Sequence, residues 1–224
     1  MSVFSGERRA ARAAVREARS GAGPTLDGAE PGPHPGAAAT FGLFGEVLTT
    51  GLLMALVALP VVTLPIALAA GIRHLRRFVS AEDSRAAFFW VDVRAGLIRS
   101  LGVGVPVALI AAALAVDIVL ANTGELPGGQ VIAVVGWGGL LVLAVALLIA
   151  AGEWEPERGW RAAIRAVPRI ASSDVVGALY LAATAVFVGV VTWMLVPLVI
   201  AGLGCAALAV VAVPARRVPE RRIR

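Results

Sequence analysis

Four long apolar runs alternate with arginine-rich segments along this chain. The first run covers residues 41–77, and Glu46 is the only ionisable side chain in its apolar part. A helix needs only about 20 apolar residues to cross a bilayer, so this run is long enough to span one. Pro60 and Pro65 each remove a backbone N–H in its second half and predict a kink or a reversal near Thr63. The run is therefore either one span or a hairpin that returns to the same side of the membrane.

The other three runs predict further membrane helices. They cover residues 100–121, 130–151 and 175–213. The last run has about forty nearly uncharged residues, which is enough for two spans joined by a turn at residues 193–197. The sequence therefore predicts an all-α fold, a polytopic transmembrane helix bundle of about five spans within residues 41–213.

The two ends of the chain differ from this apolar body. Residues 1–40 begin with a charged Arg/Ala/Glu stretch and continue as a linker rich in Gly, Pro and Ala. Because such a segment has few large apolar side chains to bury, it is predicted to be a disordered tail. Residues 214–224 form a basic C-terminal tail.

Two basic segments, residues 72–99 and 152–174, separate the apolar runs and also contain clustered aromatic residues. Aromatic rings settle at the depth of lipid headgroups while arginines reach towards water and phosphate, so both segments are predicted to be amphipathic helices at the membrane surface. In the second segment one helical face has four arginines, which are candidate lipid-facing residues: Arg158, Arg161, Arg165 and Arg169. In the first, His74 is expected to be a solvated interfacial residue.

The distribution of arginine predicts the orientation of the spans. The first basic segment holds six arginines, the loop at residues 122–129 none, the second basic segment four and the C-terminal tail five. Since cytoplasmic loops are enriched in basic residues, both basic segments and the C-terminus are expected in the cytoplasm. The side on which the N-terminus lies depends on whether the first run is a span or a hairpin.

Composition narrows the class of function. The apolar fraction is 58%, above the ~45–50% of soluble domains. The chain has no lysine, one cysteine and two histidines, and it lacks the residue sets of nucleophilic, metal-dependent or acid–base catalysis. No enzymatic activity, metal or cofactor is therefore expected. The net charge of +5 comes from membrane loops and predicts a lipid bilayer with anionic headgroups, not nucleic acid, as the partner.

Two acidic residues, Glu46 and Asp117, are the candidate intramembrane polar residues. Intramembrane acids are functional-site candidates by default, but both lie near span ends, where they can reach water. Thr63, between the two prolines, either presents its hydroxyl to a solute at a broken helix or satisfies a structural kink.

The two basic segments also resemble each other in order: aromatic, arginine, then small apolar residues. Each precedes a pair of spans. This is either a parallel internal repeat, which in many transporters builds a substrate site, or the ordinary appearance of cytoplasmic loops that re-enter a membrane.

The sequence LPVVTLPIALAAGIRHLRRF resembles the signature of the YesL-like family of bacterial integral membrane proteins, and four residues match it: Leu59, Pro60, Thr63 and Pro65. The likeness covers residues 41–101 well and later spans by layout alone. Leu64 stands where the family usually has glycine, and Ile66 where it has alanine. The resemblance implies a multi-pass protein of the bacterial cytoplasmic membrane with a link to carbohydrate uptake, and it supplies no catalytic residues.

Three functions follow as hypotheses. The first is a non-enzymatic accessory or interaction protein linked to carbohydrate uptake, with transporter subunits as partners. The second is a small solute transporter that works as a homo-oligomer. The third is a membrane scaffold that binds anionic lipid through the arginine face of the second basic segment.

Overall fold

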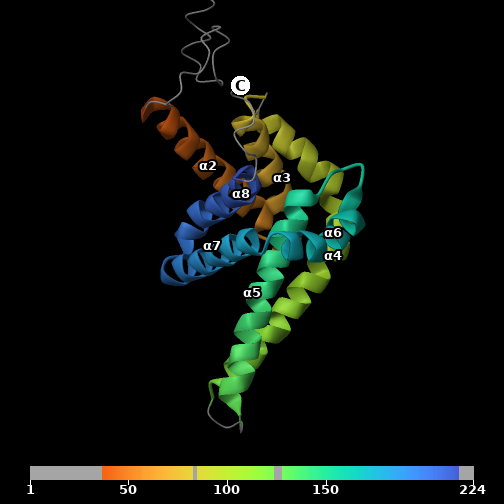
Figure 1. Cartoon of the computed structure of the whole chain (residues 1–224), viewed down its shortest axis with the longest axis vertical. Helices are drawn as coiled ribbons and strands as arrows, with labels where there is room; N and C mark the ends of the chain where they lie inside the picture. The colour runs from red at the N-terminus through yellow and green to blue at the C-terminus, as the bar shows by residue number, and fades with distance from the viewer. Residues whose placement is uncertain (1–36, 83–84, 124–127, 217–224) are drawn as a thin grey trace, which may run out of the picture.

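The computed structural model describes residues 37–82, 85–123 and 128–216. This part of the chain is helical and has no strand (Figure 1), so the predicted all-α class is confirmed. The helices are α2 (Ala37–Ala58), η1 (Val61–Thr63), α3 (Leu64–Val79), α4 (Ala86–Ala121), α5 (Gly129–Glu153), α6 (Gly159–Ser173), α7 (Val175–Met194), η2 (Val196–Leu198) and α8 (Val199–Ala215). The predicted N-terminal tail lies outside the described residues up to residue 36, and most of the C-terminal tail lies outside them from residue 217.

Four helical segments are long and apolar enough to cross a membrane: α4, α5, α7 and Val196–Ala215. Their most apolar windows are only 11–33% buried inside the protein, so most of their outward surface must face lipid or other helices. The apolar part of α2, Gly42–Ala58, is shorter. The polytopic membrane bundle is therefore confirmed at this level.

The first apolar run reverses direction. Glu46 near the start of α2 lies beside His74 near the end of α3, and Met54 contacts Gly71 between them, so the two helices are antiparallel. Of the two alternatives for this run, the structure has the hairpin. Its turn exposes Leu59 and Pro60, as expected where two prolines interrupt an apolar helix.

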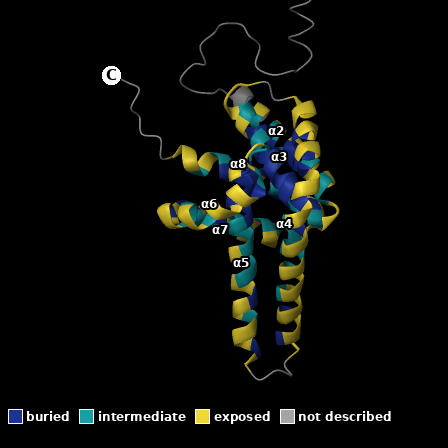
Figure 2. Cartoon of the chain, turned by 90° about the vertical axis from the view of Figure 1, so that its right-hand side faces the viewer, coloured by how far each residue is buried: buried dark blue, intermediate teal, exposed yellow. Residues whose placement is uncertain are grey.

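Helix α3 is the centre of the core. Its residues from Pro65 to Ile72 are all buried, and it contacts α2, α4, α5 and α8. Figure 2 shows this concentration of buried residues around α3 and the mostly exposed surface of the outer halves of α4 and α5. Small side chains permit the close packing: a Cβ added to Gly71 would lie 2.2 Å from Met54 Sδ.

Two helical hairpins extend from this core in different directions, α4–α5 and α7–α8 (Figures 1 and 2). Gly136 lets α5 approach Ile118 of α4, and Gly202 lets α8 approach Val188 of α7. The predicted turn between the last two spans is present, since α7 ends at Met194 and Pro197 lies in η2.

The two basic segments do not have the same structure. The first segment, residues 72–99, was expected to be amphipathic helix at the membrane surface, but residues 72–79 are the end of α3 and residues 86–99 are continuous with the following span in α4, which has 36 residues. At about 1.5 Å per residue this helix is longer than the ~30 Å hydrocarbon core, so part of it must lie outside that core. Helix α6, in contrast, is separate from the following span, because Asp174 ends it and begins α7.

Candidate functional site

One charged cluster joins the end of α3 to the first part of α4. This cluster contains Asp92 of α4, which is 4% exposed, and two arginines of α3. The Oδ2 atom of Asp92 lies 3.3 Å from Arg73 Nε and 2.8 Å from Arg77 Nη2. Arg73 and Arg77 are four residues apart and therefore share a face of α3. A buried carboxylate is costly unless it is paired, so this arrangement fixes α3 against α4.

Aromatic rings cover both of these arginines. The Arg73 guanidinium carbon lies 5.8 Å from the centroid of Trp154, and that of Arg77 lies 5.5 Å from Phe88. Trp154 is 2% exposed and its ring centroid is 5.9 Å from that of Trp160, so α5 and α6 meet at the same place. These cation–π contacts turn two arginines of the predicted interfacial segment inward.

The second contact joins His74 to Glu46. His74 Nε2 and Glu46 Oε1 are 2.6 Å apart, and His74 is only 1% exposed. The imidazole also meets Phe89 edge to face at 6.5 Å, while its Nδ1 is buried without a hydrogen-bond partner among the described residues. The expectation that His74 is solvated is wrong: the hairpin reversal brings it beneath α2, where Glu46 supplies its partner.

Asp117, the other candidate intramembrane acid, does not join this cluster. It is exposed on α4, one turn from the end of the helix at Ala121. Helix α4 runs towards the far tip of the α4–α5 hairpin (Figure 1), and Asp117 is near the end of that helix, whereas Glu46 contacts His74 of α3. The two acids therefore do not form a common site.

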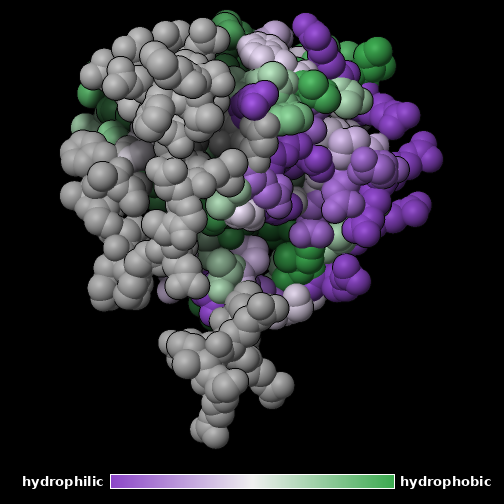
Figure 3. Space-filling model, turned by 90° about the horizontal axis from the view of Figure 1, so that it is seen from above, coloured by the Kyte–Doolittle hydropathy of each residue, from purple (hydrophilic) through white to green (hydrophobic). Residues whose placement is uncertain are grey.

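The four candidate lipid-facing arginines lie on α6 or at its N-cap, and all are exposed: Arg158, Arg161, Arg165 and Arg169. On the opposite face Trp160 is 4% and Ala163 1% exposed. Arg158 pairs with Glu155 at 3.2 Å, and the other three form no ion pair within the described part of the chain. Figure 3 shows hydrophilic side chains grouped on one part of the molecular surface.

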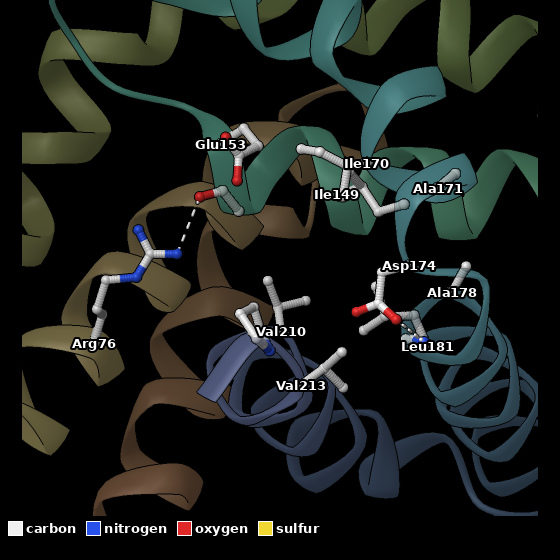
Figure 4. Close-up of a pocket in the computed structure, with 13 residues that line it drawn as sticks. Arg76, Ile149, Glu153, Ile170, Ala171, Asp174, Ala178, Leu181, Val210 and Val213 are labelled. Atoms are coloured by element: carbon white, nitrogen blue, oxygen red, sulfur yellow. Dashed lines mark hydrogen bonds between the residues drawn. The ribbon is translucent and has the colours of Figure 1, made fainter. Parts of the chain in front are cut away.

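A pocket of about 70 Å³ lies where α3, α5, α6, α7 and α8 meet (Figure 4). Its polar residues are Arg76, Glu153 and Asp174, and most of the remaining lining is apolar. Arg76 Nη2 donates a hydrogen bond to the Gly152 carbonyl at 3.1 Å. Asp174, which caps α7, accepts a hydrogen bond from Gly177 N at 2.7 Å and pairs with Arg216.

The four residues that match the family signature build the hairpin turn. Leu59 and Pro60 are exposed at its tip, whereas Pro65 is buried in the first turn of α3. The Thr63 hydroxyl donates one shared hydrogen bond to the carbonyls of Val57 and Pro60, the latter at 2.8 Å, and Thr63 is 8% exposed. Thr63 therefore satisfies the interrupted backbone. No glycine is needed at position 64, because Leu64 has φ −51°.

Sequence reasoning did not find Asp92 and Asp174. Asp174 had a detectable signal, since a Ser-Ser-Asp sequence directly before an apolar run is a helix N-cap pattern. Asp92 had only its position inside an arginine-rich segment. Within the described residues no group of three His, Cys, Asp or Glu side chains could hold a metal ion. No protein-family model, curated protein or solved structure matches the chain.

Proposed function

We propose that the chain is a non-enzymatic membrane protein whose α6 arginine face binds the phosphate groups of anionic phospholipids. The observation that carries this proposal is that α6 is buried on one face and exposed on the other. Trp160 and Ala163 hold the helix against the bundle, and three exposed arginines on the other side have no carboxylate partner among the described residues. An amphipathic helix with this arrangement is suited to the headgroup layer.

The chemistry of arginine supports the same assignment. A guanidinium presents several N–H donors in a plane and binds phosphate oxygens in pairs. Each basic residue near an anionic membrane surface contributes about 1 kcal/mol of binding free energy. Three unpaired arginines would therefore strengthen anionic lipid binding by roughly 100-fold.

The orientation is part of this proposal. Helix α3 ends beside the end of α5, through Arg76 and Gly152, and α7 begins beside the end of α8, through Asp174 and Arg216. The ends that are rich in arginine thus share one side of the bundle. We place this side, with the C-terminus, in the cytoplasm of a bacterial cell, where the positive-inside rule puts basic loops.

The test measures phosphatidylglycerol binding to the full chain in phosphatidylcholine nanodiscs. Arg161→Ala combined with Arg165→Ala is expected to weaken binding by about 2 kcal/mol, or roughly 30-fold. The matched control is Arg161→Lys with Arg165→Lys, which retains both charges and should retain most of the affinity. If the alanine pair binds phosphatidylglycerol as the wild type does, the proposal is wrong.

A second candidate is contact with partner helices, either transporter subunits or another copy of this chain. It is favoured by the outward face of α5, where a Cβ added to Gly138 would meet nothing within 4 Å and the adjacent Trp137 is 60% exposed. A glycine on a lipid-facing helix allows another helix to approach closely. The link to carbohydrate uptake rests on the sequence resemblance at the first hairpin.

Substitution of Gly138 tests this second candidate. Gly138→Ile should reduce the yield of partners or of the homo-oligomer recovered by cross-linking in membranes. Gly189→Ile is the control, because Gly189 on α7 is equally open. Equal cross-linking in both variants and in the wild type would remove α5 as the contact face.

A further inference from the structure

The pocket between the five helices holds two opposite charges that remain unpaired. Arg76 has the Gly152 carbonyl as its only partner among the described residues, and Glu153 has no hydrogen bond or ion pair there. The two side chains also form no ion pair with each other, although both line the same pocket. Figure 4 shows Arg76 and Asp174 on opposite sides of the pocket, with Glu153 on the α5 side.

The third polar residue of the pocket is already engaged. Asp174 accepts the Gly177 N–H and pairs with Arg216, and it also caps α7. The groups left for a ligand are therefore one guanidinium and one carboxylate. A simple anion would be repelled by Glu153 and a simple cation by Arg76, whereas a molecule with both charges satisfies each of them.

The size and the lining of the pocket further limit the class of ligand that it can bind. Since one water needs roughly 10–15 Å³ of such space, a pocket of about 70 Å³ holds about five waters or one small polar group. Its apolar lining includes Ile149, Ile170, Leu181, Val210 and Val213. Arg76 and Glu153 are both exposed, so they lie where this apolar pocket opens to solvent.

We infer that this pocket binds a compact zwitterion, with Arg76 on its phosphate or carboxylate and Glu153 on its ammonium group. Two sources have this chemistry: the headgroup of phosphatidylethanolamine and a free amino acid or phosphoethanolamine. The site is separate from the arginine face of α6, which is proposed to bind lipids with a net negative charge. Failure of one proposal therefore leaves the other standing.

The experiment follows thermal unfolding of the detergent-purified full chain with each of five additives: phosphatidylethanolamine, phosphatidylcholine, phosphatidylglycerol, free phosphoethanolamine and glycine. A saturable rise in Tm is expected with phosphatidylethanolamine, or with the free zwitterions if these are the source. Phosphatidylcholine should give a smaller rise, because its quaternary ammonium keeps the positive charge but has no N–H to donate to Glu153. An equal rise with phosphatidylcholine, or no rise with any of the zwitterions that carry N–H donors, would overturn the inference.

Three variants assign the effect to the pocket. Arg76→Gln and Glu153→Gln should each raise the concentration needed for half of the Tm rise by about tenfold or more, since each removes one charge-assisted contact. Glu153→Gln is the safer variant, because Glu153 is exposed and supports no contact in the described fold. Arg165→Gln on α6 is the control: it should weaken phosphatidylglycerol binding and leave zwitterion binding unchanged. Unchanged zwitterion binding in Glu153→Gln would contradict the inference.

Discussion

The imidazole of His74 lies 2.6 Å from the carboxylate of Glu46, and this contact closes the open end of the α2–α3 hairpin. At the other end of the hairpin the chain turns through Pro60 and Thr63. The two residues are 28 positions apart, and the turn brings them together. The structure thus gives this candidate intramembrane acid a structural partner.

Glu46→Ala should destabilise the protein by about 1–3 kcal/mol, because the buried imidazole loses its only hydrogen-bond partner among the described residues. Glu46→Gln retains a hydrogen-bond acceptor and should lose less. Thermal unfolding in detergent measures the difference. Asp117→Ala is the control, since Asp117 is exposed and surface substitutions usually change stability by less than about 0.5 kcal/mol. Equal losses at the two sites would show that the contact contributes nothing specific.

Asp92→Asn should cost more, about 3–5 kcal/mol, because it leaves the guanidinium groups of Arg73 and Arg77 close together without their shared carboxylate. The unfolding temperature is expected to fall strongly, and the contact between α3 and α4 is expected to be lost. The matched control is Arg94→Ala, an exposed residue two positions further along α4. A wild-type unfolding temperature for Asp92→Asn would show that the arginines find other partners.

The contacts of Glu46 and Asp92 differ from the features that can be predicted from the sequence. Length and apolarity alone indicate spans such as α5, because a helix that faces lipid must be apolar over its whole membrane length. The arginine face of α6 can also be predicted from the local sequence, since its arginines follow the helical period. The partners of Glu46 and Asp92 are not local. They depend on the α2–α3 reversal and on the position of α4, and two prolines in an apolar run permit either a kink or a turn.

Two glycines on α4 give a direct test of the packing. A Cβ added to Gly104 would lie 1.7 Å from the Val62 carbonyl oxygen, whereas one added to Gly102 would meet nothing within 4 Å. Gly104→Ala should therefore push α4 away from η1 and cost about 1–3 kcal/mol or more. Gly102→Ala should be neutral or stabilise the helix by up to about 1 kcal/mol. Both variants are measured by thermal unfolding, and equal results would contradict the close approach of α4 to the hairpin turn.

Thr63→Val should destabilise the hairpin turn by about 1–2 kcal/mol, since the hydroxyl that bonds the carbonyls of Val57 and Pro60 is lost in a buried position. For a protein of this size, such a loss lowers Tm by roughly 2–8 °C. Thr63→Ser keeps the hydroxyl and should retain most of the stability, which separates the hydrogen bonds from the shape of the side chain. Thermal unfolding of both variants in detergent decides between the two uses of Thr63 that its sequence position allows. A Thr63→Val protein with wild-type stability would argue against the structural use and return the hydroxyl to consideration as a contact for a solute.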